Sequence, residues 1–216
     1  MAKDPYTLLQ EHKIVAIMRG VAGEAADRTA EALAAGGIRL VEVTMNTEGA
    51  LDAIRRFNAR YAGQLCIGAG TVLDEEMALA AIDAGAKYLI SPNLDEAVIA
   101  CGLKHGVDVW PGTMTPTEIV RAWKAGAKAV KVFPSGSLGL AYIKEIRAPL
   151  AHIPMIATGG VTLDNVTSFL EAGVAAVGVG SSLVNKKWIA AGQYEEIQRT
   201  AEQFTAKVRD FLASGK

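Results

Sequence analysis

The chain has few of the residues from which proteins build disulfide frameworks and zinc sites. Its 216 residues include 2 cysteines and 3 histidines. The spacing of Cys66 and Cys101 indicates no disulfide framework, and each histidine stands alone, without the paired spacing of zinc ligands. We therefore expect a protein of a reducing compartment that binds no metal.

Long apolar runs and an excess of charge of either sign are also lacking. No apolar segment reaches the about 20 residues that a membrane-spanning helix needs. Residues 1–13 contain acidic side chains and no long apolar core, so they do not resemble a signal peptide. The formal net charge is −1, which gives no sign of bulk attraction to nucleic acid or to a membrane surface. These absences predict a cytoplasmic protein.

No linker rich in serine or proline interrupts the chain, which predicts one domain over residues 1–216. A helix over about 4–12 precedes eight strand–helix units whose strand ends recur roughly every 20 to 26 residues. The predicted strands are 14–18, 40–44, 65–71, 88–91, 107–110, 129–133, 155–157 and 175–179. The helices that follow them are 23–35, 48–60, 74–84, 94–104, one capped by 115–118, 138–149, one from near 164, and 194–212.

This alternation of strands and helices predicts a (β/α)8 TIM barrel with an additional N-terminal helix. The structural alternative is a doubly wound open sheet. That fold usually has fewer strands, and the first strand–helix turn, residues 18–23, lacks the G-x-G-x-x-G pattern of dinucleotide-binding sheets.

One lysine lies inside an apolar strand. Residues 129–134 read Ala-Val-Lys-Val-Phe-Pro, and because side chains alternate along a strand, Lys131 faces away from Val130 and Val132. A buried ammonium group must be paired, made neutral, or placed where the strand emerges. The structural interpretation is a lysine that is paired with a carboxylate or that extends its amine to solvent. The functional one is a Schiff-base nucleophile, which needs the lowered pKa that burial produces.

A second charged residue, Glu42, lies inside the strand 40–44. It shares one face with Leu40 and Thr44, so if the intervening valines pack against helices, Glu42 points into the barrel. Strands 2 and 6 lie opposite each other, and alternate strands fill one interior layer, so Glu42 and Lys131 are expected to converge near the axis. They form either a structural ion pair or a proton shuttle beside an amine nucleophile.

Glycine-rich loops follow predicted strands 7 and 8, the two loops that commonly hold phosphate in these barrels. The first contains Gly159 and Gly160, and the second contains Gly180 and Ser181. Glycine lets backbone N–H groups approach an anion closely, although tight turns also need glycine. We expect a phosphate site here, with a short helix starting near Ser181 contributing its N-terminal dipole.

Seven short motifs occur in order along nearly the whole chain. They are Val-Glu-Val-Thr at 41–44, Gly-Ala-Gly-Thr-Val at 68–72, Ser-Pro-Asn at 91–93, Pro-Gly-Thr-Met-Thr-Pro-Thr-Glu at 111–118, Val-Lys-Val-Phe-Pro at 130–134, Thr-Gly-Gly-Val at 158–161 and Val-Gly-Val-Gly-Ser at 177–181. Together they resemble those of the 2-keto-3-deoxy-6-phosphogluconate (KDPG) and 2-keto-4-hydroxyglutarate (KHG) aldolases, which are class I pyruvate aldolases.

The resemblance implies a role for each matching residue. Lys131 would form the Schiff base, and Glu42 would be the general acid/base. The substrate-binding set would be Arg19, Thr44, Asn46, Thr71, Pro92, Phe133 and Thr158, and the phosphate-binding set Gly159, Gly160, Gly180 and Ser181. The resemblance also implies a phosphorylated keto-acid substrate, no cofactor and a homotrimer.

Asn46 departs from the gluconate type, in which an arginine often stands at this position. Galactonate-type relatives, which act on the C4 epimer, can also have asparagine there, whereas Thr158 is similar to the gluconate type. The expected reaction is cleavage of KDPG to pyruvate and glyceraldehyde 3-phosphate, with KHG as a further substrate. The alternatives are the epimer 2-keto-3-deoxy-6-phosphogalactonate, an isomerase or epimerase in which Lys131 acts electrostatically, a barrel that binds a phosphometabolite without catalysis, and an interaction protein.

Overall fold

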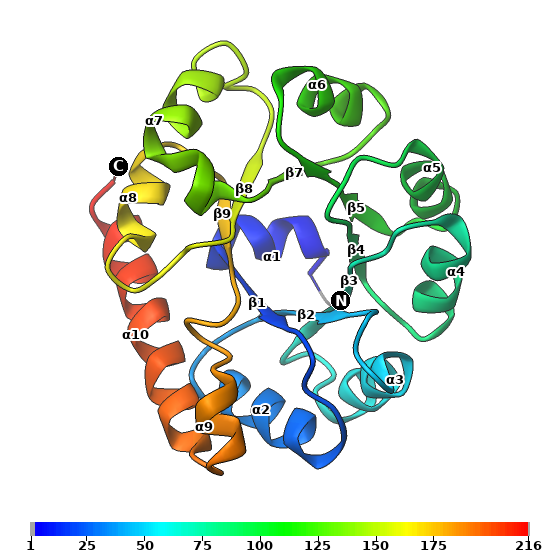
Figure 1. The fold of residues 1–216 in the computed structure, drawn as a ribbon, viewed down its shortest axis with the longest axis vertical. Helices are drawn as coiled ribbons and strands as arrows, with labels where there is room; N and C mark the ends of the chain where they lie inside the picture. The colour runs from blue at the N-terminus through cyan, green and yellow to red at the C-terminus, as the bar shows by residue number, and fades with distance from the viewer. Residues whose placement is uncertain (1–2, 216) are drawn as a thin grey trace.

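The computed structural model describes residues 3–215, which form a ring of parallel strands surrounded by helices (Figure 1). The strands are β1 (Ile14–Met18), β2 (Leu40–Thr44), β3 (Cys66–Gly70), β4 (Tyr88–Ile90), β5 (Asp108–Trp110), β6 (Gly112–Thr113), β7 (Val130–Val132), β8 (Met155–Thr158) and β9 (Ala176–Val179). The helices are α1 (Pro5–His12), α2 (Gly23–Ala35), α3 (Ala50–Arg60), α4 (Glu75–Asp83), α5 (Glu96–Lys104), α6 (Pro116–Lys124), α7 (Ser135–Arg147), α8 (Val166–Glu171), α9 (Lys186–Ala190) and α10 (Tyr194–Ala213). The barrel with an N-terminal helix is therefore confirmed.

The predicted fifth strand, 107–110, is β5, and a further short strand that was not predicted, β6, follows it after Pro111. β5 pairs with β4, whereas β6 pairs with β7. The two short strands therefore occupy one position of the barrel together, on either side of Pro111. Proline has no N–H to donate to a ladder. Its carbonyl still accepts a hydrogen bond from the Lys131 N–H at 2.8 Å. β1 pairs with both β2 and β9, which completes the other side of the ring.

The strands have two buried faces, as parallel strands covered by helices do. Val41 and Val43 belong to the larger core between the strands and the helices. Leu40, one residue earlier, packs inside the barrel with residues such as Trp110 and Ile156. The alternation predicted for residues 40–44 is therefore confirmed, and it directs Glu42 to the barrel interior.

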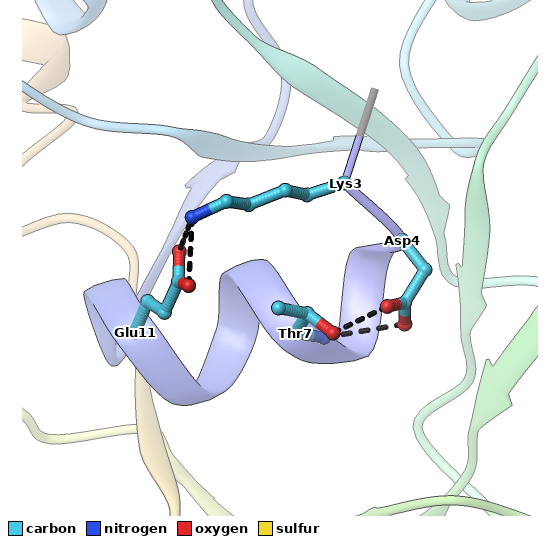
Figure 2. A network of polar contacts seen from close by, with 4 residues as sticks. All are labelled: Lys3, Asp4, Thr7 and Glu11. Atoms are coloured by element: carbon cyan, nitrogen blue, oxygen red, sulfur yellow. Dashed lines mark hydrogen bonds and ion pairs between the residues drawn. The ribbon is translucent and has the colours of Figure 1, made fainter. Parts of the chain in front are cut away.

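Helix α1 covers the amino-terminal end of the barrel interior (Figure 1). The side chain of Asp4 caps it by accepting hydrogen bonds from the N–H groups of Tyr6 and Thr7. Lys3 pairs with Glu11 at 2.7 Å along the helix (Figure 2). Leu9 is completely buried and packs with the interior residues of the barrel.

Two helices differ from the sequence expectation. α7 begins at Ser135 rather than near 138 and contains a break at Gly139, where φ is 83°. No helix starts near Ser181, so that expectation is wrong. The chain makes turns there, with the N–H groups of Leu183 and Val184 both donating to the Gly180 carbonyl, and α9 begins at Lys186 after its cap, Asn185. Among residues 3–215, no helix is long and apolar enough to cross a bilayer.

Candidate active site

The strand registers place Glu42 and Lys131 in the same layer of the barrel interior. In a (β/α)8 barrel each strand is staggered by one residue along the barrel axis relative to its neighbour, so inward-facing residues at one height come from alternate strands. Followed round the ring, the pairings put one residue from every second barrel position at one level: Glu42, Ile90, Lys131 and Gly178. β2 and β7 stand on opposite sides of the ring (Figure 1). Because Gly178 has no side chain, part of this layer is left open.

The next layer toward the carboxyl ends of the strands is also sparsely filled. Its members are Ile17, Gly70, Gly112 and Thr158. The two glycines contribute no side chains of their own. The Glu42 carboxylate occupies the space above Gly70, because a Cβ there would lie 1.8 Å from Glu42 Oε1. The backbone of Pro92 and Asn93 occupies the space beside Gly112 in the same way.

Above this layer lies a cavity of about 950 Å³. It is lined by Ile17, Arg19, Thr71, Pro92, Lys131, Phe133, Thr158, Gly159, Gly160, Val161, Thr162, Gly180, Ser181, Ser182, Val184, Asn185, Lys186 and Lys187. The structure thus brings most of the predicted site residues to one cavity. Glu42, Thr44 and Asn46 are outside its lining.

Lys131 is 3% exposed and Glu42 is 1% exposed. Neither takes part in an ion pair within residues 3–215, so the structural ion pair that the sequence left open is not formed. Lys131 Nζ lies 5.2 Å from the centroid of the Phe133 ring. Glu42 Oε1 is buried without a hydrogen-bond partner. A buried carboxylate oxygen without a partner costs stability.

Two aromatic side chains fill the barrel beneath Glu42 and Lys131. Tyr88 and Trp110 are completely buried and stack with their ring centroids 4.4 Å apart. The Tyr88 ring needs Gly68, since a Cβ there would lie 2.2 Å from the ring. Burial raises the pKa of the Tyr88 phenol well above its ordinary value, so the phenol stays neutral. The barrel is therefore closed below the site.

Arg19 connects two of the other predicted residues. Its Nη1 atom donates to Asn46 Oδ1 and to Thr71 Oγ1, both at 3.2 Å. Thr71 has a φ of 59°, a left-handed conformation that is uncommon for a threonine and is often found at functional sites. Asn46 therefore holds the guanidinium group at the rim of the cavity rather than lining the cavity itself.

Thr44 is engaged within the protein. Its hydroxyl lies 3.0 Å from that of Thr47 and 3.5 Å from the Met18 carbonyl, and Thr47 accepts a hydrogen bond from the Gly20 N–H. These contacts join the ends of β1 and β2. A substrate contact of Thr44 stays a prediction.

Gly159 and Gly160 both have left-handed backbones, with φ of 89° and 74°. A side chain at position 160 would meet the Gly136 Cα at 2.7 Å, so close packing of two loops also requires glycine. The loop after β9 is held by the Ser182 hydroxyl, which donates to the Val161 carbonyl at 2.6 Å. Without a helix at Ser181, the site has the backbone and hydroxyl donors but not the expected helix dipole.

Sequence reasoning missed Lys186 and Lys187, which line the cavity together with Arg19 and Lys131. No aspartate or glutamate is among the lining residues, so the cavity is electropositive. Two consecutive lysines shortly after the second glycine loop were the signal that could have identified them. Within residues 3–215, no group of three or more histidine, cysteine, aspartate or glutamate side chains could hold a metal ion.

A family model for KDPG and KHG aldolases matches residues 6–200. The 2-dehydro-3-deoxy-6-phosphogalactonate aldolase of Escherichia coli (strain K12) is 36% identical over 199 residues, which cover 92% of this chain and 94% of that protein. The 2-dehydro-3-deoxy-phosphogluconate aldolase of Treponema pallidum (strain Nichols) is 36% identical over 200 residues, again covering 92% and 94%.

Solved structures give the same result. A native KDPGal structure is 34% identical, with a TM-score of 0.86 over 93% of this chain and 96% of that one. The KDPG aldolase of Legionella pneumophila, with pyruvate captured at low pH as a covalent carbinolamine intermediate, is 27% identical, with a TM-score of 0.84 over 94% and 98%. The resemblance seen in the seven motifs is confirmed. The chain belongs to the KDPG and KHG aldolase family and is a class I aldolase, a lyase of carbon–carbon bonds.

Proposed function

We propose that this aldolase cleaves a six-carbon 2-keto-3-deoxy-6-phospho sugar acid to pyruvate and glyceraldehyde 3-phosphate, with Lys131 as the Schiff-base lysine. The observation that carries the proposal is a buried lysine with no carboxylate partner, in one layer with Glu42, at the bottom of an electropositive cavity. A substrate with a carboxylate and a phosphate suits a cavity that has three cationic side chains besides Lys131 and no carboxylate in its lining.

In the proposed mechanism the neutral amine of Lys131 attacks the C2 ketone and forms a carbinolamine. Loss of water then produces a protonated Schiff base, which accepts electrons from the bond that breaks. The carbinolamine captured in the Legionella relative is the adduct of an amine and a carbonyl, which supports this assignment.

Glu42 is the proposed general base and acid. Directly or through a water molecule, its carboxylate removes the C4 hydroxyl proton, the C3–C4 bond breaks, and the electron pair passes into the Schiff base to form an enamine. Glyceraldehyde 3-phosphate leaves. Protonation of the enamine at C3 and hydrolysis of the imine then release pyruvate and the free lysine.

Treating the protein with pyruvate and borohydride tests this function. We expect reduction to trap a three-carbon adduct on Lys131, located by peptide mass spectrometry. Inorganic borohydride without pyruvate is the control and should leave the peptide unmodified. No adduct, or an adduct on another lysine, would contradict the Schiff-base role of Lys131. If the protein then isomerised a sugar phosphate, it would be an isomerase instead.

The C4 configuration of the substrate is the finer question. Relatives named for the gluconate and the galactonate acid are equally similar, at 36% identity. Gluconate is the proposed substrate because Thr158 is of that type and lies in the cavity, whereas Asn46 contacts the cavity through Arg19. We expect a higher kcat/KM for the gluconate epimer, measured through pyruvate release beside the galactonate epimer and KHG. A higher kcat/KM for the galactonate epimer would indicate that Asn46, rather than Thr158, determines the preference for the C4 configuration.

Gly70→Ala should disable the enzyme through Glu42. The new Cβ would lie 1.8 Å from Glu42 Oε1 and force the carboxylate to move. We expect a stability loss of about 1–3 kcal/mol in urea denaturation, typical of overpacking, and a fall in kcat of about 10²-fold, because Glu42 no longer reaches the C4 hydroxyl. Gly180→Ala is the stability control, since a Cβ added at Gly180 would have no other atom within 4 Å. Unchanged kcat in Gly70→Ala would contradict the position assigned to Glu42.

The homotrimer and the cytoplasmic location stay predictions. Light scattering on the purified protein measures the first directly, and a monomer would contradict it.

A further inference from the structure

We propose that Lys186 is the counter-ion of the substrate phosphate and makes this enzyme selective for phosphorylated substrates. The inference rests on the proposed function and deepens it. It assigns the charge recognition in the phosphate site to one residue that lies outside the seven motifs.

The two glycine loops leave the phosphate without a charged partner. Gly159, Gly160 and Gly180 offer backbone donors, and Ser181 adds a hydroxyl, but none of them carries charge. A phosphate monoester carries about 1.5 to 2 negative charges at neutral pH. The helix dipole that could have compensated is missing at Ser181, because the nearest helix begins at Lys186 and has five residues.

Two other cations of the cavity, Lys131 and Arg19, are committed elsewhere. Lys131 lies in the interior layer with Glu42, where it must be neutral to act as a nucleophile. Arg19 Nη1 is held by Asn46 and Thr71, on the side of the cavity formed by β1, β2 and β3. The phosphate charge therefore needs a cation near the loops after β8 and β9.

Lys186 has the required position and freedom. Its Nζ atom lies above Gly20, where an added Cβ would be 2.8 Å away, so the side chain extends from the loop after β9 to the loop after β1. β1 and β9 are hydrogen-bonded neighbours, so the two loops lie at adjacent strand ends, and Lys186 lines the same cavity as Gly180 and Ser181. Across residues 3–215 it forms no ion pair, and no acidic side chain lines the cavity.

Lys187 lines the same cavity and is the natural comparison. Its backbone N–H donates to Asn185 Oδ1 at 2.9 Å as part of the helix cap, and none of its atoms would lie within 4 Å of a Cβ at Gly20. The two neighbouring lysines carry the same charge on the same short helix. Substituting each in turn therefore separates a specific phosphate contact from the general positive potential of the cavity.

The test compares Lys186→Gln, Lys186→Arg and Lys187→Gln with the parent enzyme. Each is assayed on the phosphorylated six-carbon acid and on the same acid without phosphate. A charge-assisted hydrogen bond to phosphate predicts that Lys186→Gln loses about 10- to 100-fold in kcat/KM on the phosphorylated acid, mainly through KM. Lys186→Gln should lose less than about threefold on the unphosphorylated acid, Lys186→Arg should keep most of the activity, and Lys187→Gln should lose less than Lys186→Gln on the phosphorylated acid.

Equal losses on the two acids, or a larger loss in Lys187→Gln than in Lys186→Gln, would overturn the proposal. Borohydride trapping with pyruvate, which has no phosphate, is run on every variant. Borohydride could trap pyruvate on Lys131 of the Lys186→Gln variant as readily as on the parent enzyme. If that variant also prefers the phosphorylated acid as strongly as the parent enzyme does, the role of Lys186 fails while the aldolase mechanism stands. If the parent enzyme itself is not trapped, the proposed function fails.

Discussion

Lys131→Met should abolish aldol cleavage and leave the fold intact. We expect the rate of pyruvate release to fall at least about 10⁴-fold, because methionine cannot form the carbinolamine and the remaining residues cannot replace a covalent step. The free energy of unfolding should be unchanged or higher, since methionine has a similar length and removes a buried amine that has no carboxylate partner. A lactate dehydrogenase-coupled assay and urea denaturation measure the two quantities.

Lys128→Met is the matched control, with the same substitution three residues earlier. Lys128 Nζ pairs with Asp108 Oδ1 at 2.8 Å, and Asp108 is largely buried with its Oδ2 unpartnered. We expect this variant to lose about 1–2 kcal/mol of stability and keep its activity, because the pair lies outside the cavity. The two variants should thus show opposite patterns. Activity within tenfold of the parent enzyme in Lys131→Met would refute the Schiff-base role.

Glu42→Gln should separate bond cleavage from Schiff-base formation. Gln keeps the shape of the side chain but is not a base, so we expect kcat for cleavage to fall by about 10²- to 10⁴-fold. The final yield of the pyruvate–borohydride adduct on Lys131 should be retained, because the amine itself is unchanged. Stability should also be retained, since Glu42 Oε1 has no hydrogen-bond partner that the substitution removes.

Glu48→Gln is the corresponding control. Glu48 is an exposed residue in the loop between β2 and α3, six positions further along the chain. We expect its cleavage rate to stay within about twofold of the parent enzyme, as is usual for exposed substitutions outside a site. A Glu42→Gln variant that cleaves as fast as this control would mean that another group handles the C4 proton.

Much of the candidate site could be predicted because it depends on local periodicity. Side chains alternate along a strand, so the valines beside Glu42 and Lys131 were enough to direct both residues to the barrel interior, where the structure places them. Arg19 and the glycines after β8 could be placed at the carboxyl ends of strands by the same argument. The catalytic and binding roles of these residues stay predictions that the experiments above test.

Other features depend on contacts that the local sequence does not contain. Pro111 follows the predicted strand 107–110, and only the strand pairing shows that β5 and β6, on either side of it, occupy one position in the ring. The helix expected at Ser181 was wrong because glycine and serine after a strand are compatible with both a turn and a helix start. In the structure residues 181–183 form a turn that does not continue, and α9 begins only at Lys186.

The sequence by itself determined the alternation of strands and helices, the inward direction of Glu42 and Lys131, and the family, because these depend on the period of a strand and on motifs read along the chain. Only the tertiary structure decided that no ion pair joins Glu42 and Lys131, that β6 and α9 form, and that Lys186 lies above Gly20. The physical reason is that barrel closure and its one-residue offset per strand bring together side chains that are far apart in the chain. Distances between such residues follow from packing, not from spacing in the sequence.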